Sequence, residues 1–206
     1  MPDTMNVQVT SSFLGRSYND DQSVTGDNVF GSSPTVTPAQ SFTLTTRTDA
    51  NTGELTFASA GHGITDAQKL DLYWTVAGVN YHRRNMTVGS VAGAVVPIDG
   101  GSGDDLPAAD TTIVAKVPQE EGTTAVVGAN VVGLTVKAPS YRSIVVFRTS
   151  AGAEILAVVL AAGDSYTWNS NSGVTNPVTG QTIAKISFSH ADTSNSQETS
   201  AYGLYN

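Results

Sequence analysis

The sequence contains no cysteine and few charged or aromatic residues. Without cysteine, the 206-residue chain can form no disulfide, no thiolate metal site and no cysteine nucleophile. Charged residues make up only 14% of the chain and aromatic residues only 7%. No apolar run is long enough to span a membrane, and the first residues lack the basic and apolar regions of a secretory signal. We therefore expect a protein that is made in a cytoplasm and stays in solution.

Basic residues are also scarce. Ten Lys and Arg stand against 18 Asp and Glu, which gives a net charge of −8. Nucleic-acid binding needs clustered cations to neutralise phosphates, so this composition argues against a nucleic-acid partner. The acidity lies in the first 120 residues, which hold 13 acidic and 6 basic residues, whereas the remainder holds 5 and 4.

β-branched residues dominate what is present. The chain has 26 Thr and 24 Val, which fit a pleated sheet surface better than a helix. Twenty Gly and eight Pro are scattered along the chain and supply turns. This composition predicts an all-β fold of antiparallel strands with little or no helix, arranged as two sandwich-like or barrel-like domains.

Alternating apolar and polar residues place the expected strands. Residues 49–53 (DANTG) predict a hairpin turn between the second and third of them. Residues 154–162 are ambiguous, because their Ala, Leu and Glu favour a helix while the flanking turn residues favour a hairpin partner for residues 143–148. The expected strands lie within residues 6–13, 41–48, 54–60, 69–76, 81–88, 90–98, 111–117, 130–139, 142–149, 153–168 and 182–190.

The distribution of polar segments predicts the domain organisation. Residues 15–40 are polar and interrupted by Gly and Pro, which is typical of a loop or arm. Residues 118–124 (PQEEGTT) combine Pro, charge and Gly between two apolar stretches, as a domain boundary does. We therefore expect an N-terminal β domain over residues 1–117, a linker over 118–124 and a small sandwich over 125–206.

No catalytic motif is visible, and the metal-binding candidates are weak. The sequence has no Gly-x-Ser-x-Gly, P-loop or dinucleotide-binding pattern, so we expect no enzymatic activity and no cofactor. Asp99, Asp104 and Asp105 lie in a Gly-rich loop that could wrap around Ca²⁺, but the loop lacks the ligand spacing of an EF-hand, so a solvated loop is the favoured interpretation. The three histidines, His62, His82 and His190, are expected at the surface or at strand edges.

Several residues are candidates for contact with a partner. His82, Arg83 and Arg84 form the one run of adjacent basic residues and could meet an acidic surface. Tyr202 and Tyr205 end the chain and predict either a last strand or an aromatic tail on a neighbouring subunit. Trp74 and Trp168 are expected in the core, with a sugar-stacking platform as the alternative.

Two stretches covering about a third of the chain resemble small β-rich virion proteins of tailed bacteriophages. They are residues 71–107 (DLYWTVAGVNYHRRNMTVGSVAGAVVPIDGGSGDDLP) and residues 162–189 (AGDSYTWNSNSGVTNPVTGQTIAKISFS). The resemblance lies in Thr-, Val- and Gly-rich strands, mild acidity and the hairpin formed by GDSYTW and SGVTNP. It implies a head decoration or minor capsid protein, or a tail or fibre module, none of which brings a catalytic residue.

These features predict a non-enzymatic structural protein of a virus particle. It would bind other virion proteins, such as a major capsid or tail protein, and stabilise the assembled shell through subunit contacts. A homo-oligomer, and first of all a trimer, is expected because closed symmetry is the rule for such subunits. The alternative function is a carbohydrate- or receptor-binding module of a tail or fibre.

Overall fold

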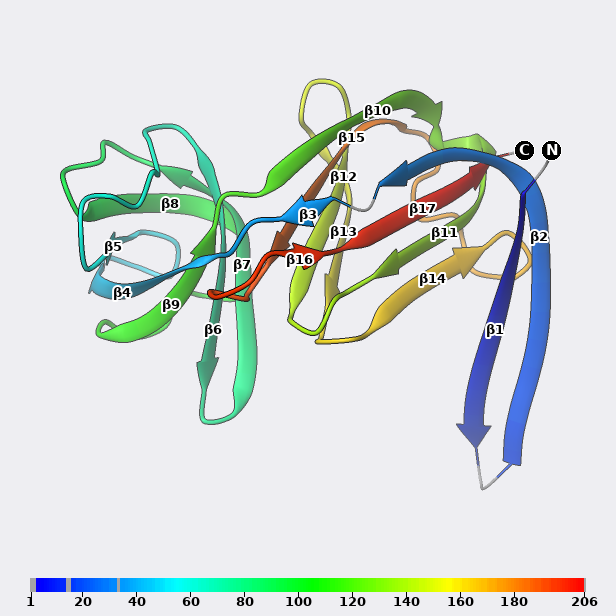
Figure 1. Ribbon diagram of the computed structural model, residues 1–206, viewed down its shortest axis with the longest axis horizontal. Coiled ribbons are helices and arrows are strands. Elements are labelled where there is room, and N and C mark those ends of the chain that lie inside the picture. The colour runs from blue at the N-terminus through cyan, green and yellow to red at the C-terminus, as the bar shows by residue number, and fades with distance from the viewer. Residues whose placement is uncertain (1–2, 14–15, 33, 206) are drawn as a thin grey trace.

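The computed structural model confirms an all-β protein built from antiparallel strands. It describes residues 3–13, 16–32 and 34–205, and it describes side chains within residues 34–122, 125–197, 199 and 201. Every strand pair in these ranges is antiparallel. A six-stranded closed barrel forms one end of the molecule and a two-sheet sandwich forms the other (Figure 1).

The barrel closes in the order β4-β5-β8-β7-β6-β9. Because a closed sheet has no free edge, this domain hides the backbone groups that would otherwise pair with other chains. Its strands are β4 (Gln40–Arg47), β5 (Gly53–Thr56), β6 (Lys69–Val76), β7 (Val79–Val88), β8 (Val95–Gly103) and β9 (Thr111–Lys116).

The sandwich packs a five-stranded sheet, in the order β1-β2-β17-β11-β14, against a four-stranded sheet, in the order β10-β15-β12-β13. The first sheet contains β1 (Asp3–Phe13), β2 (Arg16–Ser32), β11 (Val131–Lys137), β14 (Ser165–Asn169) and β17 (Ser200–Tyr205). The second contains β10 (Gln119–Val127), β12 (Ser143–Arg148), β13 (Glu154–Leu160) and β15 (Thr182–His190). A short pair, β3 (Thr35–Val36) and β16 (Gln197–Glu198), completes the domain, and a single 3-10 turn, η1, covers Gly128–Asn130.

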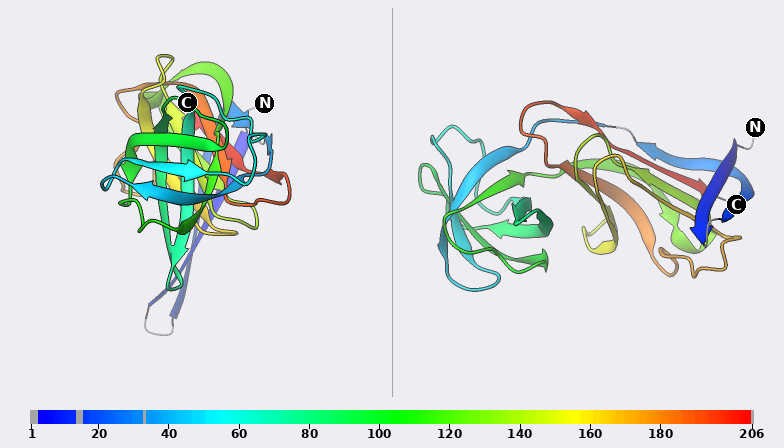
Figure 2. Two further views of the ribbon diagram at one scale, coloured as in Figure 1. Left: turned by 90° about the vertical axis from the view of Figure 1, so that its left-hand side faces the viewer. Right: turned by 90° about the horizontal axis from the view of Figure 1, so that it is seen from below.

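The chain starts in the sandwich, builds the barrel and returns, which differs from the predicted domain division. β2 pairs with β17 at the other end of the chain, and β3 pairs with β16. Residues before 40 therefore belong with the C-terminal strands and not with the barrel, and both ends of the chain lie at the far end of the sandwich (Figures 1 and 2). Local sequence gave no sign of these pairings, because they join strands more than 150 positions apart.

Two segments expected to be irregular are strands. β2 spans most of the predicted arm, residues 15–40, and β10 spans the predicted linker, residues 118–124. β10 is an edge strand of the four-stranded sheet, where exposed Glu and Gln are tolerated and protect the open edge. Residues 154–160 resolve as strand β13, the hairpin partner of β12.

Each domain has its own apolar core. Leu70, Leu72 and Trp74 of β6 alternate into the barrel, as the sequence pattern predicted. The sandwich core is formed between its two sheets and includes Phe147 of β12 and Phe188 of β15. A third, smaller apolar cluster lies between the domains, where Tyr73 of β6 meets Ile144 and Val146 of β12.

Gly128 in η1 should not tolerate a side chain. A Cβ built there would lie 1.8 Å from the carbonyl oxygen of Val178, and Gly128 N–H donates to the Gln181 carbonyl at 2.7 Å, which holds the two backbones together. We expect Gly128→Ala to lower the free energy of unfolding by about 1–3 kcal/mol, measured by urea denaturation. Gly122→Ala in β10, where a Cβ has no neighbour within 4 Å, is the control and should change it by less than about 0.5 kcal/mol. Equal losses in both variants would contradict this explanation.

Strands β1 and β2 form a hairpin that projects from the sandwich, here called the arm (residues 3–26). Residues 27–32 of β2 pair with β17, but residues 16–26 pair with β1 alone. β1 is the edge of its sheet. Figure 1 shows the arm turning away from the sandwich beyond the β17 pairing and standing beside the body.

Candidate functional site

A buried polar network joins the barrel to the sandwich. Asp71 and Tyr73 alternate with the core-facing residues of β6, and both are buried on the opposite face of that strand. The Ser189 hydroxyl donates to Asp71 Oδ2 at 2.6 Å, so the Tyr73 hydroxyl, 2.7 Å away, donates to Ser189 Oγ. Asp71 Oδ1 accepts the backbone N–H of Asn85 at 2.9 Å.

Burial controls the protonation of this network. It raises the pKa of Asp71, against the lowering effect of the Ser189 and Asn85 hydrogen bonds. Burial, together with the nearby Asp71 carboxylate, raises the pKa of Tyr73 well above its usual value. A serine between an acid and a tyrosine could suggest nucleophilic chemistry, but Ser189 is completely buried and therefore offers no surface to a substrate. The arrangement serves to fix the two domains against each other.

Two arginines complete the contact between the domains. Arg84 of β7 forms a bidentate salt bridge with Glu154 of β13. Nη2 donates to Oε1 at 2.7 Å and Nε donates to Oε2 at 3.1 Å. The hydrogen bond from Arg84 lowers the pKa of Glu154. Arg142 Nη1 donates to the Trp74 and Tyr81 carbonyls at 3.0 and 3.2 Å. Arg142, which precedes β12, therefore fixes the β6–β7 hairpin against the sandwich.

A cavity of about 400 Å³ opens between the domains beside these contacts. Lys69 and Arg148 line it together with Glu120, so its wall carries charges of both signs. Arg148 is already committed through Nε to Ser187 Oγ at 3.2 Å and through Nη1 to the Gly152 carbonyl at 3.2 Å. The lining therefore carries one net positive charge, and these two hydrogen bonds hold Arg148 in place.

Arg83 organises the acidic loop that was considered as a calcium site. Its Nε donates to the Gly100 carbonyl at 2.7 Å, its Nη1 to the Asp104 carbonyl at 2.8 Å and its Nη2 to Asn51 Oδ1. Backbone carbonyls that could have ligated a cation thus accept hydrogen bonds from a guanidinium. Arg83, expected to face a partner, is instead buried.

The acidic side chains of this loop do not converge. Asp99 accepts a hydrogen bond from the Thr52 hydroxyl at 2.9 Å, and Asp104 accepts one from the His82 backbone N–H at 2.8 Å. Asp105 is exposed. Among the residues whose side chains are described, no three His, Asp or Glu are grouped so as to hold a metal ion.

The expectation of surface histidines is wrong for His62 and His190, which are buried. Each uses its ring to close a turn: Nδ1 accepts the backbone N–H two residues later, at 3.0 Å in His62 and 3.1 Å in His190. Nε2 then donates to a carbonyl, Gly93 at 3.1 Å and Val36 at 2.9 Å respectively. His82 is half-buried, and desolvation lowers its pKa although Asp104 lies 3.5 Å away.

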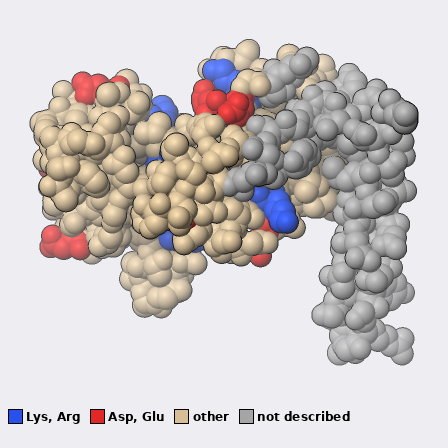
Figure 3. All heavy atoms as spheres, viewed as in Figure 1, with Lys and Arg blue, Asp and Glu red and all other residues tan. Residues whose placement is uncertain are grey.

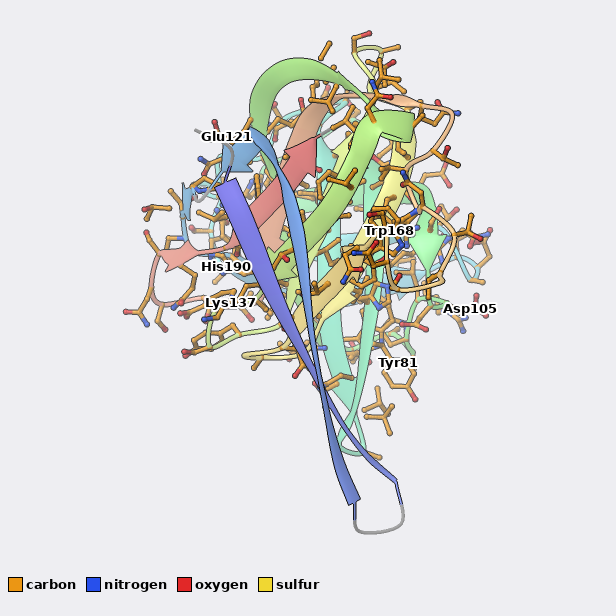
Figure 4. All side chains as sticks on the ribbon, turned by 90° about the vertical axis from the view of Figure 1, so that its right-hand side faces the viewer. Tyr81, Asp105, Glu121, Lys137, Trp168 and His190 are labelled. Carbon is orange, nitrogen blue, oxygen red and sulfur yellow. The ribbon has the colours of Figure 1, made fainter. Side chains whose placement is uncertain are left out.

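The two tryptophans belong to different cores and do not form a joint stacking platform. Trp74 is buried in the barrel and stacks on Tyr81, with ring centroids 5.9 Å apart and planes 10° from parallel. Trp168 is buried in the sandwich and donates from Nε1 to the Val174 carbonyl at 3.0 Å (Figure 4). Tyr202 and Tyr205 lie in β17 between β2 and β11, so the chain end adds a last strand.

Two exposed valines lie at the end of the β6–β7 hairpin. Val76 and Val79 are 46% and 53% exposed, and Tyr141 and Val159 are 39% and 42% exposed. Figure 3 shows the hairpin end as a projection without charged side chains on the face in view. We call Val76 and Val79 the apolar tip.

A small hollow lies between the β6–β7 hairpin and the end of β13. A cavity of about 120 Å³ is lined by Val159, Tyr81, His82 and Arg142, and by Asn80, the neighbour of Val79. Tyr141 precedes Arg142, whose guanidinium is fixed to this hairpin. Sequence reasoning missed this surface because Val76 and Val79 lie in a strand–turn–strand pattern that does not show which side the sandwich covers.

No family model, no curated protein and no solved structure matches this chain. Within the described ranges, no helix has the length and hydropathy needed to cross a membrane.

Proposed function

We propose that this chain is a non-enzymatic structural protein of a virus particle, of the bacteriophage decoration or minor capsid kind. The observation that carries the proposal is the arm. An isolated two-stranded hairpin is marginally stable in water, so a hairpin that leaves its own domain gains stability by lying on another molecule. Such arms suit a protein whose work is to bury surface between subunits.

The rigid joint between the domains supports the same function. Asp71, Tyr73 and Ser189 form hydrogen bonds across the joint out of contact with solvent, and Arg84 and Glu154 close its rim. A subunit that bridges neighbours in a shell needs its two binding ends held at a constant separation. The side chains that could take part in chemistry form hydrogen bonds and ion pairs within the chain, which favours a structural over an enzymatic role.

The alternative carbohydrate-binding role gains no support from the geometry. It was based on Trp74 and Trp168 as stacking surfaces, and both indole rings are buried in separate cores. Sugar stacking requires an exposed aromatic face, so these two residues cannot provide it.

The test is the protein content of particles from a host culture that carries the gene. Particles purified on a density gradient should contain the chain at a fixed number of copies per particle by quantitative mass spectrometry. The chain should remain with them through a high-salt wash, because a contact made by apolar surface is little screened by salt. Its absence from washed particles, while the gene is expressed, would contradict the proposal.

A further inference from the structure

Arg148 of β12 is a buried cation without a carboxylate partner in the described part of the chain. Its exposed fraction is 6%, and it takes part in no ion pair between described residues. Its Nε and Nη1 donate to the Ser187 hydroxyl and the Gly152 carbonyl, which are neutral acceptors. Burying a charge without an opposite charge raises the free energy of the folded state. An anion bound beside Arg148 would offset that cost.

One guanidinium nitrogen of Arg148, Nη2, still has its donors available. It forms no hydrogen bond with a described residue, whereas Nε and Nη1 both do. Among the described side chains that are not exposed, only Gln40 Oε1 and Thr199 Oγ1 are buried without a partner, so Nη2 is reached by solvent. Because Arg148 is otherwise buried and lines the cavity of about 400 Å³ between the domains, Nη2 donates into that cavity.

The barrel contributes two more donors to the lining, Lys69 of β6 and Asn85 of β7. Lys69 Nζ donates to Thr87 Oγ1 at 2.6 Å and keeps two further protons, and Lys69 also forms no ion pair with a described residue. Asn85 has a φ of 61°, a left-handed conformation that asparagine tolerates, and its backbone N–H is held by Asp71 Oδ1 at 2.9 Å. Its side-chain amide forms no hydrogen bond with a described residue, so it can also donate into the cavity.

The carboxylates near the cavity already have partners. Glu120 lines it, and its Oε2 lies 3.6 Å from Lys185 Nζ. Asp71 and Glu154 interact electrostatically with Arg148, but each has hydrogen-bond partners of its own and neither lines the cavity. The two cations of the lining are therefore available to an anion from solution.

We propose that this cavity binds a phosphate-type oxyanion, either inorganic phosphate or the phosphoryl group of a small monoester. Arg148 donates from the sandwich, and Lys69 and Asn85 donate from the barrel, so the donors come from three strands. A tetrahedral oxyanion accepts hydrogen bonds from several directions, whereas a carboxylate accepts them close to one plane. The bound anion joins the two domains. This inference goes beyond the proposed function and does not depend on it.

Equilibrium dialysis of the full chain tests the site with two probes, labelled inorganic phosphate and, separately, labelled glycerol 1-phosphate. At an ionic strength held constant with chloride, at least one probe should bind at one molecule per chain with a Kd of about 1 mM or below. The probe that binds more tightly shows whether free phosphate or a monoester is the source. Absence of saturable binding by both would overturn the proposal. Equally effective competition by acetate would indicate an acidic side chain of a partner and would also overturn it.

Three substitutions of exposed residues show whether the probe binds in this cavity. Lys69→Met removes a lining cation and should weaken binding about fivefold. Glu120→Gln removes the negative charge of the lining and should tighten binding about twofold or more. Lys137→Met, in β11 and outside the cavity lining, is the control and should change the affinity less than about twofold. All three side chains are exposed, so the variants should fold.

Arg148→Lys tests the buried cation itself. It keeps the charge but loses the planar fork of donors, so the affinity should fall about tenfold or more. Urea denaturation checks that this variant is folded, and the three exposed variants decide the matter if it is not. An unchanged affinity in both Lys69→Met and Glu120→Gln, or an equal loss in Lys137→Met and Lys69→Met, would mean that the anion binds elsewhere and would overturn the proposal.

Discussion

Replacing Arg83 with Met should lower the free energy of unfolding by about 3–5 kcal/mol. Methionine keeps most of the buried aliphatic volume but donates no hydrogen bond. The Gly100 and Asp104 carbonyls and the Asn51 side chain would each lose their charged donor. These acceptors lie in two separate segments of the chain. Without the guanidinium, no single side chain joins the two segments at this end of the barrel.

The effect should be local as well as global. Gly100 N–H donates to the Asn51 carbonyl at 3.1 Å, and Leu106 N–H donates to the Ala50 carbonyl at 2.9 Å. Both bonds link the loops that Arg83 holds, so amide hydrogen exchange at Gly100 and Leu106 should accelerate in Arg83→Met before the core exchanges. Urea denaturation measures the global loss.

Arg84→Met is the matched control for Arg83→Met. The neighbouring arginine pairs with Glu154 in a partly exposed site, where an ion pair contributes at most about 1 kcal/mol. A loss in Arg84→Met as large as that in Arg83→Met, or unchanged exchange at Gly100, would show that Arg83 does not organise these loops.

The contrast between these two arginines shows what the sequence could predict about the candidate site. Strand alternation sends adjacent residues to opposite faces, so Arg83 and Arg84 could not both meet one partner. That signal was readable in the sequence. The sequence did not show which face each arginine would take. That choice depends on the loops around Asn51 and Gly100 and on Glu154, which lies 70 positions from Arg84.

Strands with a covered face were predictable, and strands held by distant partners were not. Residues 69–76 alternate clearly and form β6 with those bounds. β10 begins with Gln119, Glu120 and Glu121, a polar edge strand that carries little apolar pattern. β2 is fixed at its end by β17, and no local pattern records a pairing with the other end of the chain.

Buried polar residues escaped prediction for a related reason. Asp71 and Tyr73 lie on the outer face of a barrel strand, which would be solvated if the barrel stood alone. The sandwich covers that face and supplies Ser189 as a partner. A carboxylate within an otherwise apolar strand such as KLDLYWTV is thus a sign that a second domain covers the strand, although it does not name the covering residue.

Asp71→Asn should make the folded chain more stable at neutral pH, by an amount that shrinks as the pH falls. Burial raises the pKa of Asp71 in the folded chain above its value in the unfolded chain. Between the two pKa values the folded state binds the proton more tightly, so the free energy of unfolding falls as pH rises. Above both values the full cost of burying the charge is present, and asparagine does not incur it.

The hydrogen bonds of the network can survive this replacement. The asparagine oxygen can accept the Asn85 N–H, and its amide can donate to Ser189 Oγ. Asp71→Ala keeps neither contact and leaves buried donors unpaired, so it should be about 1–3 kcal/mol less stable than Asp71→Asn at neutral pH. Asp105→Asn, at an exposed carboxylate, controls for the loss of one negative charge from the chain.

Urea denaturation of the native chain and the three variants at several values between pH 4 and pH 8 measures both effects. Other carboxyl groups titrate in every variant, so the quantity to compare is the difference between Asp71→Asn and the native chain at each pH. That difference should be largest at pH 8 and should decline toward pH 4, as protonation of Asp71 removes its buried charge. A native chain more stable than Asp71→Asn at every pH would mean that ionised Asp71, with the charges of Arg84 and Arg148 nearby, favours folding, and that the joint between the domains is held by charge rather than by neutral hydrogen bonds.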